Sequence, residues 1–298
     1  MSGKDLSYFT DTEDWHPETS DAYAPTKRRS KEAWKLVDDF AKRTNSGLWH
    51  HISRRSLVLS LRQRIDFPDE TQQGSTNLCG VSVMVSAWAY ECTVQYVTFA
   101  IDIFEKGRGF MVGRNPQAAR SIQPSVELRT AVPPIGMEHA DWLVSASIRE
   151  SLNRVFNYTP GEGIFAIKAF TTPGDVVTQF RALGYRNVRD TVSIAKTQGY
   201  GSLMEASHLY QSHWRVVLLI NSWLIGDRSR RNHLIRYGNH WVALSSAIVP
   251  VVGTDSQAVR PLQRWSGGSK GTTVSDGGKP ILLSDVIHSY FGYIAGRF

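Results

Sequence analysis

The chain has 298 residues, of which 41% are hydrophobic and 20% charged, and its formal net charge is +7. This is the composition of a globular protein with one large domain or two modest ones, and it excludes a fibrous or low-complexity chain. No apolar run reaches the roughly 18 residues that a transmembrane helix requires, so we expect no membrane span. The basic clusters at 27–29 and 228–231 are not interleaved with aromatic residues in a recognisable motif, which argues against nucleic acid as a partner.

The first part of the chain, residues 1–45, is polar and charged, and we expect a partly irregular N-terminal arm there. Within it, 30–43 has the apolar spacing of a short amphipathic helix. The first residues lack the basic-then-apolar pattern of a secretory signal. We therefore expect synthesis in the cytoplasm without a cleaved signal peptide, followed either by retention there or by export along a route that reads no such signal.

The remainder, 46–298, is predicted to be a single α+β domain, with helices first and sheet last. It begins with an apolar run at 57–61 and a polar loop at 62–76. Periodicity and stop signals predict helices at 79–92 (capped by Asn77), 94–105, 140–153, 173–183 (ended by Gly184), 203–211 and 284–289. The predicted strands are 163–170, 214–225, 240–252, 258–265 and 290–294.

The chain has two cysteines, Cys79 and Cys92, on the same predicted helix. On that helix they lie about 20 Å apart along the axis and point to nearly opposite sides, so they cannot form a disulfide. We expect two free thiols, as in a reducing compartment. Cys92 is interpreted as a small buried hydrophobic residue.

Cys79 stands where a nucleophile would be placed, at the first turn of a helix. A helix N-terminus presents unsatisfied N–H groups and a partial positive charge, which favour a thiolate. Gln73, shortly before it, offers a side-chain amide that could stabilise an oxyanion together with the Cys79 backbone N–H. His240 opens an otherwise apolar strand after a glycine-containing turn and is the candidate general base. The alternative is that Gln73 caps a loop and Cys79 only packs beneath the sheet.

These motifs resemble the papain-like cysteine peptidase superfamily, in which a glutamine precedes the cysteine and a histidine follows far downstream. Cys79-Gly80 has no tryptophan after it and His240 begins a strand, so the resemblance is closer to bacterial double-glycine leader peptidases and related papain-fold toxin or effector domains. It covers roughly residues 60–298. It implies a helical N-terminal part, with the nucleophile at a helix N-terminus packed on a C-terminal antiparallel sheet, and it implies Cys79 as nucleophile, His240 as base and Gln73 in the oxyanion hole.

The residue that would orient His240 is the least defined part of the site. In the family, an asparagine or aspartate on the strand after the histidine has this role. Asn221 precedes His240, which is the wrong chain order, and we interpret it as a decoy. Asp255 follows His240 but lies at the tip of the predicted hairpin, tens of ångströms away. A regular hairpin would pair His240 with Ser266, the geometric candidate, ahead of Gln263 and Asp255; a Cys–His dyad and a decayed site are the alternatives.

Three functions are open at this point. The first is a cysteine hydrolase that cleaves a peptide or amide bond through an acyl-enzyme, in the setting of a secreted bacterial effector or toxin that the resemblance implies. The second is a deamidase or transamidase with the same Cys–His site, and the third is a catalytically inactive papain-fold binding module. No CxxC or HExxH pattern is present, so we expect no metal and no cofactor. The resemblance implies a protein or peptide substrate, cell-wall peptides included, and for a toxin a cognate immunity protein.

Overall fold

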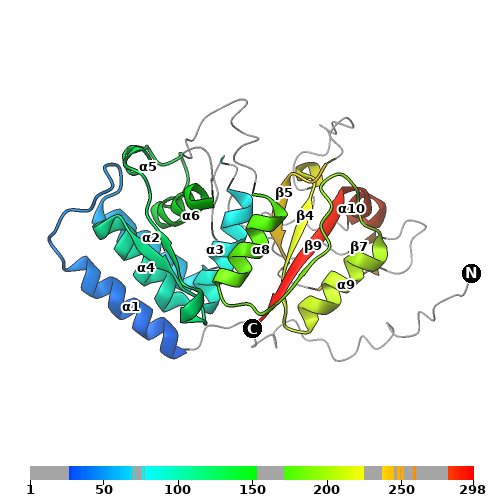
Figure 1. Ribbon diagram of the computed structural model, residues 1–298, viewed down its shortest axis with the longest axis horizontal. Helices are drawn as coiled ribbons and strands as arrows, with labels where there is room; N and C mark the ends of the chain where they lie inside the picture. The colour runs from blue at the N-terminus through cyan, green and yellow to red at the C-terminus, as the bar shows by residue number, and fades with distance from the viewer. Residues whose placement is uncertain are drawn as a thin grey trace, which may run out of the picture.

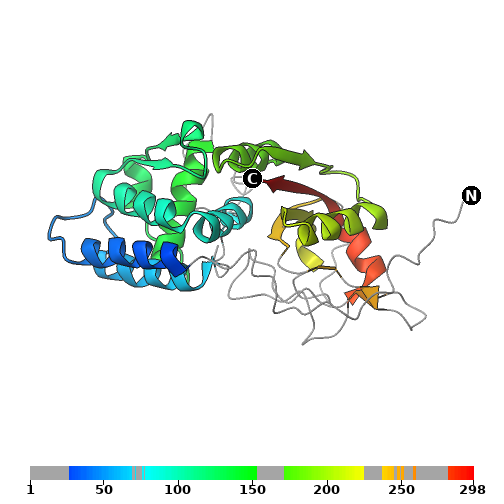
Figure 2. The ribbon, with the colours of Figure 1, turned by 90° about the horizontal axis from the view of Figure 1, so that it is seen from below.

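The computed structural model describes residues 27–68, 71, 76, 78–152, 171–224, 237–244, 247–248, 250–251, 258–259 and 281–298. They form a helical half and a sheet half that lie side by side, with helix α3 between the two (Figures 1 and 2). The chain is therefore α+β, as the sequence predicts, with helices first and antiparallel strands last. Within the described ranges, no helix is both long enough and apolar enough to cross a membrane.

The helical half is built around α3, Cys79–Glu91, whose residues 79–89 are all buried. A helix that is apolar on every side must be covered on every side, and α3 packs on α2, α4, α6, α8 and strand β5. The surrounding helices are α1 (Lys27–Ala41), α2 (Arg54–Asp66), α4 (Thr93–Lys106), the short α5 (Val126–Thr130) and α6 (His139–Leu152). A small hairpin, β1 (Gly109–Met111) with β2 (Arg120–Ile122), follows α4, and a 3-10 turn, η5 (Pro116–Ala118), joins its strands.

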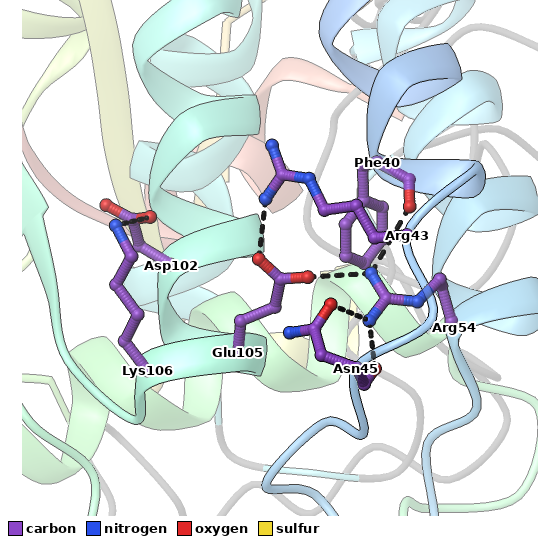
Figure 3. Close-up of polar contacts among 7 residues, drawn as sticks. All are labelled: Phe40, Arg43, Asn45, Arg54, Asp102, Glu105 and Lys106. Atoms are coloured by element: carbon purple, nitrogen blue, oxygen red, sulfur yellow. Dashed lines mark hydrogen bonds and ion pairs between the residues drawn. The ribbon is translucent and has the colours of Figure 1, made fainter.

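Helix α1 belongs to the helical core, although it lies within the segment expected to be an arm. Its residues Ala33, Val37 and Phe40 are fully buried, and the helix packs on α2 and α4. Arg43 and Arg54, from the ends of this helix pair, donate to the Glu105 carboxylate on α4 at 2.6 and 2.8 Å (Figure 3). Burial would raise the pKa of Glu105, but these two arginines and Asn45 hydrogen-bond to it and lower the pKa below its usual value.

The sheet half has four antiparallel strands in the order β3-β9-β4-β5. Their bounds are β3 Asn187–Asp190, β9 Tyr290–Arg297, β4 Arg215–Ile220 and β5 His240–Ala243. Helices α3 and α8 (Pro173–Ala182) cover one face, and α9 (Tyr200–Gln211) and α10 (Leu283–Ser289) cover the other. We call the two apolar clusters the main core, which includes Val217, Leu219 and Trp241 together with α3, and the second core, which includes Val216, Leu218 and Val242 together with α9 and α10.

A second, three-stranded sheet has the order β6-β7-β8, with β6 Pro250–Val251, β7 Ala258–Val259 and β8 Ile281–Leu282. A 3-10 turn, η6 (Ser222–Leu224), follows β4. The prediction of one long strand at 240–252 is therefore wrong, because β5 ends at Ala243 and β6 pairs in a different sheet.

Most predicted helices are confirmed, including those that begin at Cys79 and Pro173. Glycines end two of them as expected, with Gly107 and Gly184 at φ of 65° and 91°. The polar loop predicted at 62–76 is wrong at its start, because α2 continues to Asp66 and buries Arg64 and Ile65. The predicted strand at 163–170 and the cap at Asn77 lie outside the described residues.

Candidate active site at the start of helix α3

Cys79 is the first residue of α3, and its thiol lies against the edge of strand β5. Directly after β5, the Leu244 N–H donates to the carbonyl of Val216 on β4. Because N–H groups alternate in direction along a strand, those of Ala243 and Trp241 point away from β4. The backbone N–H of Trp241 reaches the Cys79 sulfur, where it favours the thiolate. The fold thus brings the start of α3 to the residue that follows His240.

The electrostatic environment of Cys79 contains opposing influences. Burial, which leaves the residue 5% exposed, raises the pKa of the thiol above its usual value and is the largest effect. The backbone N–H groups of Trp241, Gly80 and Cys79 and the charge of Arg149 act in the opposite direction. The helix N-terminus favours the thiolate, as expected, but burial outweighs it. The resting site therefore holds a neutral thiol.

His240 begins β5, and its side chain belongs to the opposite face of the sheet from α3. It pairs with Ile220, whose side chain lies in the second core, whereas Trp241 lies in the main core. Paired residues on antiparallel strands share a face. Burial lowers the pKa of His240 to about 4, and its Nε2 has no hydrogen-bond partner among the described residues. The imidazole is thus neutral at physiological pH, and in this buried position it is a weak base.

Because this imidazole is buried and neutral, we expect the protein to lose stability in mild acid. The folded pKa of His240, about 4, is below the usual 6.5, so below pH 6.5 the unfolded chain binds a proton that the folded chain excludes. The contribution of the neutral His240 to the free energy of unfolding is complete above pH 6.5 and falls by roughly 3 kcal/mol on the way to pH 4. Urea unfolding between pH 7.5 and 4.5 measures this fall. His240→Gln should flatten the profile and His208→Gln, at an exposed site on α9, should not; equal profiles for wild type and His240→Gln would contradict the assignment.

Thr171 is a residue of this site that sequence reasoning missed. Its carbonyl accepts a hydrogen bond from Trp241 Nε1 at 2.8 Å, and its side chain packs on Gly80. A β-carbon added at Gly80 would lie 2.5 Å from Thr171 Cβ, so position 80 has room for a glycine alone unless Thr171 moves. Thr171 precedes Thr172, the N-cap of α8. The sequence gives a signal for this cap, but no signal that links it to Cys79.

Asn221 is brought next to the start of β5, directly after Ile220. Its Nδ2 donates to the carbonyl of Tyr237 at 3.2 Å, and its Oδ1 accepts from the Trp223 N–H at 3.1 Å. These bonds shape the turn after β4.

The other candidate residues, Gln73, Asp255, Gln263 and Ser266, lie outside the described residues. The hairpin on which Ser266 was inferred is present between β6 and β7, with Pro250 opposite Val259. Because β5 and β6 belong to different sheets, that register does not extend back to His240. The pairing that the structure gives His240 is with Ile220 on β4.

Both cysteines are thiols outside any disulfide, as expected. The described part of the chain contains no group of three or more histidine, cysteine, aspartate or glutamate side chains placed to hold a metal ion. No protein-family model, curated protein or solved structure matches this chain.

Proposed function

We propose that the chain is a cysteine hydrolase of the papain-like class, acting on a peptide or amide bond through Cys79 and His240. The observation that carries this proposal is the contact between the first residue of α3 and the start of strand β5, where the Trp241 N–H reaches the Cys79 sulfur. A papain-like site has the same parts, a thiol at the N-terminus of a buried helix and a histidine at the start of a strand. The α+β architecture and the antiparallel sheet support it further.

In the proposed reaction, His240 accepts the proton of the Cys79 thiol as the sulfur attacks the carbonyl carbon. The tetrahedral oxyanion collapses, the bond to the leaving group breaks, and His240 returns the proton to that group. A water molecule then hydrolyses the thioester. Because the resting thiol and imidazole are both neutral, the pair works by general-base catalysis and not from a preformed ion pair. His240 must turn its ring toward the edge of β5, and its Nε2 loses no hydrogen bond to a described residue when it does so.

The second candidate is a catalytically inactive binding module of the same class. The register of β5, which assigns the His240 side chain to the face of the second core, is the observation that favours it. The two candidates differ in whether the imidazole reaches the thiol when a substrate is present.

Acylation by 4-nitrophenyl acetate distinguishes the two without knowledge of the natural substrate. We expect the wild-type protein to release nitrophenolate in a burst, Cys79→Ser to lose the burst, and Cys92→Ser to keep it. Cys92 is the matched control, because it is also a buried thiol and lies at the end of the same helix. A burst that persists in Cys79→Ser would refute the hydrolase.

A further inference from the structure

A buried hydroxyl lies against Gly80, the residue that follows the proposed nucleophile. Thr171 is fully buried, and its Oγ1 has no hydrogen-bond partner among the described residues. Buried polar groups are nearly always paired, and an exception calls for an explanation such as a functional role. Valine has the same shape as threonine and would fill this position equally well. Packing alone therefore does not require a hydroxyl at position 171.

The position of this hydroxyl relates it to Cys79. Oγ1 lies 2.9 Å from the point where a β-carbon on Gly80 would stand, so it is packed against the first turn of α3. The N–H groups of Val81 and Ser82 in that turn already donate to the Leu78 carbonyl. Those of Cys79 and Gly80 instead favour negative charge on the sulfur. The hydroxyl therefore lies against Gly80, one of the two residues in this turn whose backbone N–H groups favour negative charge on the sulfur.

Thr171 is also held in place from two sides. The Trp241 indole donates to its carbonyl, while the backbone of the same tryptophan contacts the Cys79 sulfur. On the other side, Thr172 and Asp175 form a reciprocal capping box that fixes the start of α8. A donor held by rigid elements costs little reorganisation when charge develops nearby.

We propose that the Thr171 hydroxyl is an oxyanion donor of the Cys79 site, which acts together with the backbone N–H groups at the start of α3. This inference rests on the proposed hydrolase function. In the resting protein the hydroxyl has no partner among the described residues; when Cys79 attacks a carbonyl, the hydroxyl donates a hydrogen bond to the oxygen that acquires the negative charge. No proton leaves Thr171, and the bond is released when the intermediate collapses.

The test compares Thr171→Val and Thr171→Ser in acylation by 4-nitrophenyl acetate. Loss of one oxyanion donor typically lowers the rate by about 100-fold or more, so we expect Thr171→Val to show that loss and Thr171→Ser to stay close to wild type. Urea unfolding is the second readout. Thr171→Val should unfold at the wild-type midpoint or a higher one, because it replaces an unpaired buried hydroxyl with a methyl group.

Each outcome of this test decides between alternatives when Cys79→Ser is assayed in parallel. Slow acylation by Thr171→Val without loss of stability supports the inference. Wild-type acylation by Thr171→Val, with an inactive Cys79→Ser, overturns the role of Thr171 and leaves the hydrolase intact. A Thr171→Val protein that is both slower and less stable assigns the hydroxyl a structural role and also overturns it. An active Cys79→Ser removes the proposed function, and the role of Thr171 with it.

Discussion

Replacing Arg64 with methionine is expected to lower the free energy of unfolding by roughly 3–5 kcal/mol, the usual effect of removing one partner of a buried ion pair. Arg64 on α2 and Asp141 on α6 are both fully buried and form a bidentate pair, with Nε–Oδ1 and Nη2–Oδ2 distances of 3.0 and 2.7 Å. The Arg64 Nη1 also donates to the Phe67 carbonyl at 2.6 Å. The variant leaves the Asp141 carboxylate in the core without that guanidinium.

Urea unfolding of three variants tests this expectation. Arg64→Met should be strongly destabilised, and the double variant Arg64→Met/Asp141→Leu should recover much of the loss, because neither member of this pair is then left as a charge without its partner. Arg62→Met is the matched control on the same helix, since the Arg62–Asp38 pair is 38% and 49% exposed and such pairs contribute about 1 kcal/mol or less. Similar losses for Arg62→Met and Arg64→Met would show that burial of the pair has no special effect.

Removing the imidazole of His240 is expected to lower acylation by 4-nitrophenyl acetate at pH 7 by about 100-fold or more, the contribution of a general base. The effect is large because burial raises the pKa of the Cys79 thiol, so little thiolate exists without a base. His240→Ala tests this, with His208→Ala as the control at an exposed histidine. The double variant with Cys79→Ser should be no slower than Cys79→Ser alone, because the two residues act as a unit.

The pH profile of the same reaction supplies an independent check on His240. Burial lowers its pKa to about 4, and the base works only when it is unprotonated. The acylation rate should therefore stay high down to pH 5 and fall through a midpoint near 4. A midpoint near 6.5, or an unchanged rate in His240→Ala, would assign the base to another group.

The helices were predictable because their signals are local. Cys79 begins a run that is apolar on all sides, and Thr172 with Pro173 and Asp175 gives the signature of a capped helix. Gly107 and Gly184 adopt the left-handed conformation that ends a helix at little cost. These features depend on neighbouring residues alone, so they can be predicted from the sequence.

The long-range contacts of the site could not be predicted from the sequence in this way. Alternation along β5 shows that His240 and Trp241 face opposite sides, but only the packing of α3 decides which side meets Cys79. The apolar run after His240 likewise does not reveal that the chain leaves one sheet at Ala243 and enters another at Pro250. The position of Thr171 at this site could not be predicted, because the residues that it contacts, Gly80 and Trp241, are distant along the chain.

The proposed hydrolase must form a covalent acyl group on Cys79. Intact-mass analysis of the protein quenched in acid during reaction with 4-nitrophenyl acetate, followed by peptide mapping, detects this intermediate. We expect one acetyl group on the peptide that contains Cys79, absent from Cys79→Ser and strongly reduced in His240→Ala. A protein that carries no adduct at Cys79, or carries it equally with and without the His240 imidazole, would refute the proposed mechanism.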